Sequence, residues 1–290
     1  MAGTSLSQQA IDDIVGDLIA PPSSSLILPE GARRLFPTDN APIYTIDNSN
    51  QILKAGPFVK LSEAEAIQFV SCVTRIPVPK VHESYVFEGK GYIFMDRIPG
   101  RPLSQIWKQL SSEHRSSMVF QLQLVVKQLN SWRGHFFGAL WDQPSVDVFF
   151  RHLPFKDAKL SYGPFKTRQE YNMGLVRALR NARPQGVLDE LDRSLIDQLL
   201  QINDDTKVFS HGDLHLDNIL VDEATHRITG IVDWEGAGFS IRGRDYFEAK
   251  SRARDPMWSA ALDEIFEEQD RKHYHLFQEL NQALTRYTGI

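Results

Sequence analysis

The pattern of hydrophobic and polar positions changes about a third of the way along the chain. The first third contains short β-rich runs bounded by turn residues, which is the pattern of strands rather than helices. These runs are residues 42–46, 51–55 and 91–95. The polar stretch Asp-Asn-Ser-Asn at residues 47–50 predicts a hairpin turn between the first two strands. We therefore expect a small antiparallel sheet in this part of the chain.

Helical spacing interrupts these strands at residues 62–74. Ser62 is a candidate N-cap, and Glu65, three residues later, would complete a capping box. A second amphipathic stretch, at residues 11–19, predicts a helix that docks on the same part of the chain. The first third is therefore expected to combine a sheet with one or two helices.

The chain becomes mainly helical after residue 97. Ile98-Pro99-Gly100-Arg101-Pro102 is a cluster of breaker residues and predicts a hinge. Apolar positions then recur at helical spacing in residues 105–108, 112–132, 167–181, 188–202 and 263–288, with a β-rich island at residues 207–210, 219–221 and 228–232. The prediction is an α+β fold, with an N-terminal sheet lobe at residues 1–97 and a mainly helical C-terminal lobe at residues 98–290.

Composition supports this division and excludes several classes of protein. The 290 residues are 42% hydrophobic and 24% charged, which excludes a disordered chain. A single core stops growing at roughly 250–300 residues, so two lobes are favoured. The one cysteine excludes an intramolecular disulfide. With 32 basic against 37 acidic residues, the net charge of −5 argues against nucleic acid as the main partner.

The sequence also lacks the usual membrane and export signals. No stretch approaches the roughly 18 consecutive apolar residues that a membrane-spanning helix needs. The N-terminal residues have no basic segment, and three aspartates interrupt their apolar positions, unlike a signal peptide. We therefore expect a cytoplasmic protein without a membrane partner. Nothing in the sequence indicates an oligomeric state.

The β-rich island carries the strongest chemical signal. His211, Asp213 and Asn218 follow the spacing His-x-Asp-x-x-x-x-Asn, which is typical of protein-kinase catalytic loops. A loop held between two strands can aim a carboxylate at an attacking hydroxyl and an amide oxygen at a metal ion. We interpret Asp213 as the candidate catalytic base, Asn218 as a metal ligand and His211 as structural support. A simple turn or capping pair remains the alternative for Asp213 and Asn218.

A second carboxylate favours the catalytic interpretation. Asp233 ends the apolar run Ile231-Val232 and lies 20 residues after Asp213. A carboxylate at a strand end beside Asn218 can complete a Mg²⁺ site, because Mg²⁺ prefers one or two protein oxygens together with phosphate oxygens and water.

Lys54 supplies the positive charge that phosphate binding needs. It lies near the end of the predicted strand at residues 51–55 and could hold the α- and β-phosphates of a nucleotide. We predict Glu65, in preference to Glu63, as its ion-pair partner. The alternatives are a solvated strand face for Lys54 and the capping box alone for Glu65.

Together these stretches resemble the aminoglycoside phosphotransferase family, particularly its fungal branch, over about residues 45–270. The most specific motif is His-Gly-Asp-Leu-His-Leu-Asp-Asn at residues 211–218, supported by Ile-Val-Asp-Trp-Glu-Gly-Ala-Gly-Phe at 231–239 and Ile-Pro-Val-Pro-Lys-Val at 76–81. That family shares the protein-kinase-like fold with choline and homoserine kinases. The resemblance implies a bilobal protein-kinase-like fold with ATP in the cleft between the lobes.

The resemblance also implies roles for individual residues. ATP and Mg²⁺ would be the cofactors, with Asn218 and Asp233 as the metal ligands and Asp213 as the catalytic base. Lys54 and Glu65 would orient the ATP phosphates. The adenine edge would meet the backbone of the residues at the predicted hinge, Asp96 and Ile98.

Two departures from the protein-kinase pattern shape the expected function. No glycine lies between Gly31 and Gly56, so a turn at residues 36–40 would have to replace a glycine-rich loop over the phosphates. Residues 236–254 contain no Ala-Pro-Glu triplet, which disfavours a protein substrate. We expect phosphate transfer from ATP to a hydroxyl of a small molecule. The alternatives are a nucleotide-binding pseudokinase without turnover and, third, a protein kinase.

The acceptor itself is open. Five acidic residues within eight positions could attract a cationic acceptor, although an ordinary solvated helix face is the favoured interpretation. These residues are Asp263, Glu264, Glu267, Glu268 and Asp270.

Overall fold

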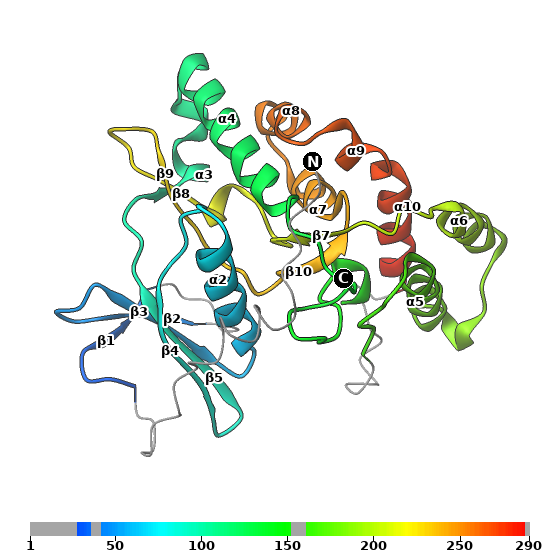
Figure 1. The fold of residues 1–290 in the computed structure, drawn as a ribbon, viewed down its shortest axis with the longest axis horizontal. Coiled ribbons are helices and arrows are strands. Elements are labelled where there is room, and N and C mark those ends of the chain that lie inside the picture. The colour runs from blue at the N-terminus through cyan, green and yellow to red at the C-terminus, as the bar shows by residue number, and fades with distance from the viewer. Residues whose placement is uncertain (1–27, 36–41, 152–160, 288–290) are drawn as a thin grey trace. The chain divides into compact units, whose positions relative to one another are not determined.

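A computed structural model describes residues 28–35, 42–151 and 161–287 (Figure 1). The chain divides into two compact units. The unit that we call the sheet unit contains the described residues up to Gln121 together with Leu216–Glu235. The helical unit contains Leu122–His215 and the described residues from Gly236 onwards. The predicted helix at residues 11–19 and the predicted turn at 36–40 lie outside the described residues.

A five-stranded antiparallel sheet forms the first part of the sheet unit, in the order β1-β2-β3-β5-β4. Its strands are β1 (Ala32–Arg34), β2 (Ile43–Ile46), β3 (Gln51–Gly56), β4 (Val81–Phe87) and β5 (Lys90–Asp96). The three predicted strands and the hairpin turn between β2 and β3 are confirmed. β4 escaped prediction because polar residues interrupt its alternation and a bulge shifts its register between Val81 and Glu83.

One face of this sheet carries a cluster of apolar and aromatic side chains, and helix α2 covers the other. Leu53 and Ala55 of β3 join Tyr85 and Tyr92 in a buried cluster, in which the two tyrosine rings stack 5.2 Å apart. Successive side chains of a strand point to opposite faces. Lys54 therefore points away from this cluster, towards the face covered by helix α2 (Figure 1).

Helix α2 (Leu61–Val73) begins one residue earlier than predicted. Its N-cap is Lys60, and no side chain caps it, so the predicted capping box of Ser62 and Glu65 does not form. The helix packs against β4 and β5. Its buried side chains are Glu63, Ala64, Ala66, Ile67, Phe69 and Val70. This packing fixes which helix positions face the sheet and therefore which acidic residue can reach Lys54.

The sheet unit extends past the boundary expected at residues 97 and 98. It also contains β6 (Arg101–Pro102), α3 (Leu103–Ile106), the 3₁₀ helices η1 (Trp107–Gln109) and η4 (Leu216–Asn218), and the hairpin β8 (Ile219–Val221) and β9 (Ile228–Ile231). β6 pairs with β8, and β8 pairs with β9. The Thr229 hydroxyl donates to the Pro99 carbonyl over 2.6 Å. A Cβ at Gly230 would lie 2.7 Å from Ile98 Cγ2. These contacts join the predicted hinge to the hairpin.

The helical unit contains the other described residues, and the division runs through helix α4 (Ser112–Leu129). Its elements are η2 (Val148–Phe150), α5 (Arg168–Asn181), η3 (Pro184–Gly186), α6 (Glu190–Gln201), β7 (Lys207–Ser210), β10 (Gly238–Ile241), α7 (Arg244–Arg252), α8 (Pro256–Ile265), α9 (Glu268–Arg271) and α10 (Tyr274–Thr285). The core combines aromatic and aliphatic residues, among them Phe149, Tyr171 and Phe277. The predicted helices at residues 167–181 and 188–202 are confirmed by α5 and α6.

The single helix predicted at residues 263–288 is wrong. The chain forms three helices there, α8, α9 and α10. Glu267 starts α9 with a capping box that includes Asp270. Asp270 is also bonded to Arg242, 28 positions earlier in the chain. This ion pair joins the start of α9 to the segment before α7. A contact over 28 positions cannot be recognised from the local sequence.

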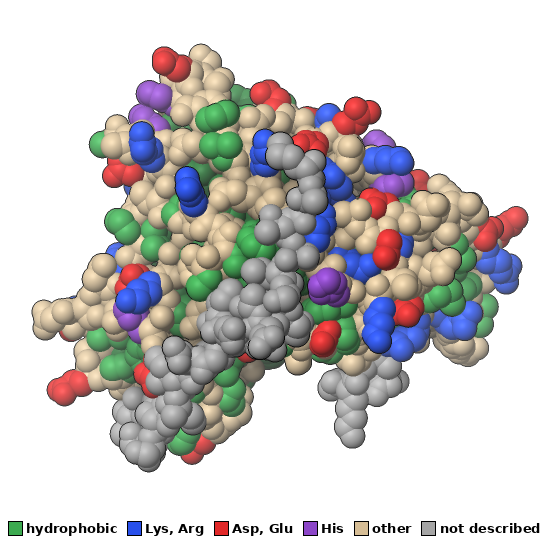
Figure 2. Space-filling model, in the orientation of Figure 1, with side chains coloured by type: hydrophobic (Ala, Val, Ile, Leu, Met, Phe, Trp, Pro, Cys, Tyr) green, Lys and Arg blue, Asp and Glu red, His purple; other side chains and the backbone are tan. Residues whose placement is uncertain are grey.

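No helix among the described residues is long and apolar enough to cross a membrane. On the face drawn in Figure 2, basic and acidic side chains are interspersed.

Candidate active site

Lys54 holds a buried position on β3 with two acidic neighbours. Its side chain is 6% exposed. The ammonium Nζ donates to Glu63 Oε1 over 3.0 Å and lies 2.8 Å from Glu63 Oε2. It also donates to Asp233 Oδ1 over 2.8 Å. All three residues belong to the sheet unit, so one cation joins β3, α2 and the segment after β9.

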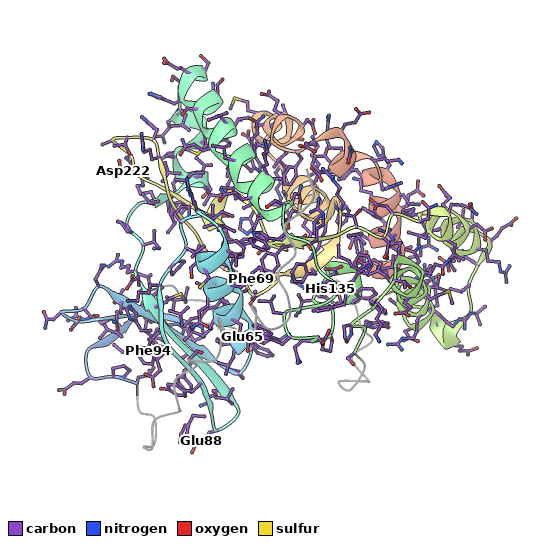
Figure 3. The ribbon with its side chains drawn as sticks, in the orientation of Figure 1. Glu65, Phe69, Glu88, Phe94, His135 and Asp222 are labelled. Atoms are coloured by element: carbon purple, nitrogen blue, oxygen red, sulfur yellow. The ribbon has the colours of Figure 1, made fainter. Side chains whose placement is uncertain are left out.

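The predicted partner Glu65 does not make this ion pair, because Glu63 takes that place. In α2, Glu63 lies one turn before the buried Ala66 and Ile67 and therefore faces the sheet. Glu65 lies two positions further round the helix, one turn before Phe69 (Figure 3). A comparison of apolar neighbours would have favoured Glu63, since Ala66, Ile67 and Val70 lie on its own face. The capping-box pattern favoured the wrong residue.

Burial and the neighbouring charges shift the pKa values of both Lys54 and Glu63. Burial by itself lowers the pKa of Lys54, but the carboxylates of Glu63 and Asp233 outweigh it and hold that pKa above its ordinary value. For Glu63, complete burial raises the pKa to about 7, although the Lys54 charge acts in the opposite direction. Asp233 and Glu235 add to the rise because they are also negative.

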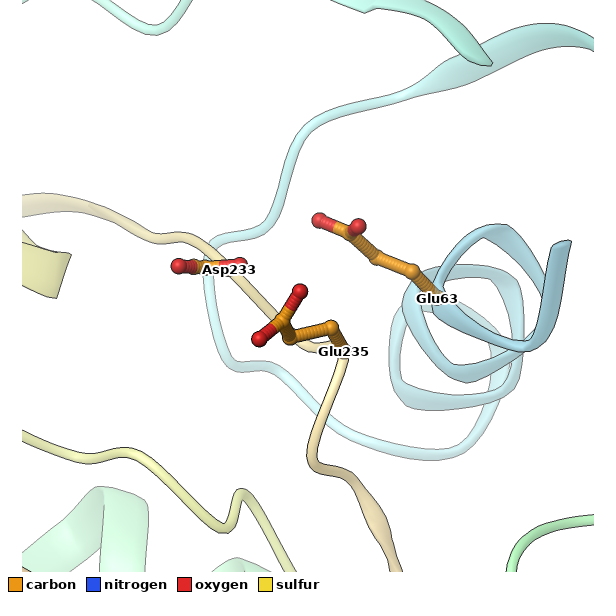
Figure 4. A group of neighbouring side chains, drawn as sticks. All are labelled: Glu63, Asp233 and Glu235. Carbon is orange, nitrogen blue, oxygen red and sulfur yellow. The ribbon is translucent and has the colours of Figure 1, made fainter. Parts of the chain in front are cut away.

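The two carboxylates that contact Lys54 form a group with a third, that of Glu235. Glu63, Asp233 and Glu235 each offer one oxygen, and these oxygens lie within 4.8 Å of one another. Figure 4 shows Glu63 reaching from α2 towards the other two, which come from the segment after β9. Asp233 has a left-handed backbone with φ of 66°, a conformation that aspartate tolerates better than most residues. A hard cation such as Mg²⁺ takes oxygen ligands of this kind, so the donor set fits a metal ion.

Asn218 lies close to Asp233 along the β8–β9 hairpin. It ends η4 and is 7% exposed. Its carbonyl accepts a hydrogen bond over 3.0 Å from the N–H of Val232, the residue before Asp233. This bond makes the backbone of Asn218 a neighbour of the segment that carries Asp233. Their roles as metal ligands stay a prediction, and the carboxylate group also contains Glu235, which the sequence interpretation did not assign.

Asp213 belongs to the helical unit and follows β7. Its N–H donates to His211 Nδ1 over 3.1 Å, and His211 is fully buried, as expected of a supporting residue. His215 Nε2 lies 3.5 Å from Asp213 Oδ2. Arg252, the last residue of α7, forms an ion pair with Asp213 Oδ1. The Asp213 side chain is 15% exposed, which leaves it accessible to a ligand.

The surroundings keep Asp213 ionised. Burial acts to raise the pKa of Asp213, but the hydrogen bond and charge of His215 and the charges of Arg252 and His211 lower it below its ordinary value. A carboxylate of this kind can accept a proton that leaves a reacting hydroxyl.

Asp245 holds the same loop in place, and sequence reasoning did not find it. Its two carboxylate oxygens accept hydrogen bonds from the N–H groups of His211 and Gly212, over 3.0 and 2.7 Å. Its neighbour Arg244 is buried and pairs with Asp147 and Glu248. Arg244 also donates to the Gly236 carbonyl over 2.8 Å. No local signal marks Asp245, because it bonds to residues more than 30 positions earlier.

The two predicted adenine-binding residues lie at and just after the end of β5. The Asp96 carboxylate lies 2.6 Å from His82 Nε2, and its N–H donates to the Lys80 carbonyl. Ile98 packs against Gly230. Their part in nucleotide binding stays a prediction.

Comparison with known proteins shows which family and fold this chain resembles. The model of the phosphotransferase enzyme family, APH, matches residues 60–280. Two subtelomeric hrmA-associated cluster proteins of Aspergillus fumigatus are each 24% identical, over 63% of this chain and 51% of the relative. The chain therefore spans about half the length of these relatives.

A crystal structure from Ralstonia eutropha, described as a candidate aminoglycoside phosphotransferase, has a similar fold. The TM-score is 0.54, with 16% identity, and the match covers 97% of this chain and 85% of that one. At this identity the likeness concerns the fold alone. Because the family match spans most of the chain and includes both acidic loops, this protein belongs to the phosphotransferase enzyme family and has its kinase-like fold.

Proposed function

We propose that this phosphotransferase moves the γ-phosphate of Mg·ATP to a hydroxyl group of a small molecule. The observation that carries the proposal is the buried Lys54, joined at once to Glu63 and to Asp233. A buried lysine between two carboxylates has little structural purpose that an apolar pair would not serve as well. It does suit a site in which phosphate oxygens and a metal ion take over some of these contacts.

Each group has a role in the proposed reaction. Lys54, held by Glu63, binds phosphate oxygens of ATP. Asn218 and Asp233, with Glu235 nearby, would hold Mg²⁺, which neutralises charge on the phosphates when bound. Asp213 accepts the proton of the acceptor hydroxyl. The hydroxyl oxygen forms a bond to the γ-phosphorus, the bond from that phosphorus to the β–γ bridging oxygen breaks, and ADP leaves. We also propose that the reaction takes place in the cytoplasm.

The pseudokinase is the second candidate, since no glycine-rich loop precedes Lys54. A small-molecule acceptor is preferred to a protein, because the segment from Gly236 to Arg254, which forms β10 and all of α7, contains no Ala-Pro-Glu triplet.

The test combines binding, turnover and one substitution. Mg·ATP should raise the melting temperature of the protein, and EDTA should abolish that rise. A screen of hydroxyl compounds should release ADP. Asp213→Asn should lower kcat by about 10²–10⁴-fold and leave Mg·ATP binding intact, because the proton acceptor is lost and the phosphate contacts are not. Asp222→Asn, at the exposed turn of the β8–β9 hairpin, is the control and should keep full activity.

Three results would decide between the candidates. Unchanged turnover in Asp213→Asn would contradict the proposed role of Asp213. Binding of Mg·ATP without product for any acceptor would favour the pseudokinase. Transfer to intact proteins but to no small alcohol would favour a protein kinase.

A further inference from the structure

Arg252 contacts the carboxylate that the proposed reaction uses. Its Nη1 pairs with Asp213 Oδ1, and the arginine side chain is 48% exposed. Among the described residues this contact uses Nη1 alone, so Nε and Nη2 can meet a second acceptor. A guanidinium presents its N–H groups as a planar fork that matches a carboxylate or a phosphate. The contact therefore puts an exposed guanidinium, which is able to bind an anion, next to the candidate base.

Arg252 is the group beside Asp213 that is always positively charged. The charges and hydrogen bonds that lower the pKa of Asp213 come from His215, Arg252 and His211. A polycationic acceptor would have to place its own positive charge beside Arg252. Like charges at such a distance repel, and that repulsion would weaken binding.

The acidic stretch near the C-terminus does not compensate for this. Asp263 accepts hydrogen bonds from Lys250 and from the Tyr246 hydroxyl, each over 2.7 Å. Glu267 and Asp270 both pair with Arg242. Three of the five carboxylates that could attract a cation are therefore bonded within the helical unit, where they hold its helices together.

We propose that the acceptor carries a carboxylate or phosphate group besides its hydroxyl, and that Arg252 binds this anion. The inference rests on the proposed function. An ion pair with an exposed partner contributes little to stability, so the acceptor's anion can draw Arg252 away from Asp213 at little cost. Asp213 is then free to accept the hydroxyl proton while the hydroxyl oxygen bonds to the γ-phosphorus. Arg252 thus links binding of an anionic acceptor to the release of the base.

The test uses four probes that share a primary hydroxyl and differ in charge: glycerol, D-glycerate, glycerol 3-phosphate and ethanolamine. Binding to the full chain is measured by calorimetry in the presence of Mg²⁺ and a non-hydrolysable ATP analogue. We expect at least one of the two anionic probes to bind about tenfold or more tightly than glycerol, as a charge-assisted hydrogen bond predicts, and ethanolamine to bind no better than glycerol. The two anionic arms distinguish a carboxylate from a phosphate.

Substitutions assign the effect to Arg252. Arg252→Ala should lose the preference for the anionic probe, and Arg252→Lys should recover part of it. Arg254→Ala removes an exposed arginine two positions away and should keep it. The melting temperatures of all three variants should match that of the original protein, because both arginines are exposed.

Several results would overturn the inference. These are equal binding of the anionic probes and glycerol, preference for ethanolamine, and unchanged binding in Arg252→Ala. Weaker binding of the ATP analogue in Arg252→Ala, with the probes unaffected, would assign Arg252 to the nucleotide instead. If the anionic probes bind no better than glycerol, but Mg·ATP binds and turnover depends on Asp213, only the inference about the acceptor is wrong. If Mg·ATP does not bind, the proposed function falls first.

Discussion

Lys54 owes its orientation to the residues on either side of it. Glu63 reaches it from α2 and Asp233 from the segment after β9, so its ammonium group is held from two directions. A long lysine side chain carries about 2 kcal/mol of rotamer entropy, and the two ion pairs remove that freedom before any ligand binds. In the proposed function, Glu63 keeps Lys54 in place when Asp233 turns to a metal ion.

This geometry predicts different effects for substitutions of Glu63 and Glu65. Glu63→Gln should raise the KM for ATP about tenfold, because a neutral amide holds the Lys54 ammonium less firmly than a carboxylate does. Glu65→Gln should leave the KM for ATP unchanged within about twofold, since Glu65 does not pair with Lys54. Steady-state kinetics with varied ATP would measure both. Equal effects of the two substitutions would contradict the assignment of Glu63.

At the scale of elements, the first residues of α7 fix the backbone of the loop after β7. Asp245 binds two of its N–H groups, and Arg244 packs against Gly212. Gly212 has φ of 77°, and a Cβ there would lie 2.2 Å from Arg244 Nη2 and 2.3 Å from the Gly236 carbonyl oxygen. The glycine is therefore required both by its backbone conformation and by the space around it.

Alanine substitutions at Gly89 and Gly212 distinguish the effect of backbone conformation from the effect of limited space. Gly89 has φ of 73° but open space around its position, so Gly89→Ala adds backbone strain alone. We expect Gly89→Ala to cost about 1 kcal/mol of unfolding free energy and Gly212→Ala about 3 kcal/mol or more, with lower activity. Urea denaturation of the two variants gives the comparison. Similar losses in both would show that the space around Gly212 can relax.

At the scale of the whole molecule, buried ionisable groups set the dependence of stability on pH. Burial raises the pKa of Glu63 to about 7. Between about pH 4.5 and 7 the folded protein holds a proton that the unfolded chain has released, so the stability that Glu63 contributes falls as the pH rises through this window. Asp192 has the opposite shift. Its burial is outweighed by hydrogen bonds from Arg183 and the backbone, which lower its pKa. Its contribution is lost when the pH falls through that lowered value.

The expected result is a maximum of stability on the mildly acidic side of neutrality. The urea midpoint should be higher at about pH 5.5 than at about pH 8, and should fall again below about pH 4. In Glu63→Gln the slope between pH 5.5 and 8 should become smaller, because a glutamine does not titrate. A midpoint in the original protein that rises steadily from pH 5.5 to 8 would contradict the raised pKa of Glu63.

Local sequence was enough to predict the loops that carry the candidate site residues. Asp213, Asn218 and Asp233 lie in short segments whose strands and spacing follow from neighbouring residues alone, and β7, β8 and β9 form where expected. The hairpin β2–β3 and helices α5 and α6 were predictable for the same reason. Hydrophobic periodicity and turn residues act over a few positions, so they can be recognised without knowing what packs against them.

Tertiary structure decided which side chains complete these loops. Glu63 rather than Glu65 meets Lys54 because α2 turns that face to the sheet. Arg252 reaches Asp213 across 39 positions, and Asp245 reaches His211 across 34. Contacts over such separations depend on how whole elements pack, and a linear pattern does not encode that packing residue by residue. The sequence by itself determined the class of chemistry, and the packing of α2 and α7 determined which charges surround it.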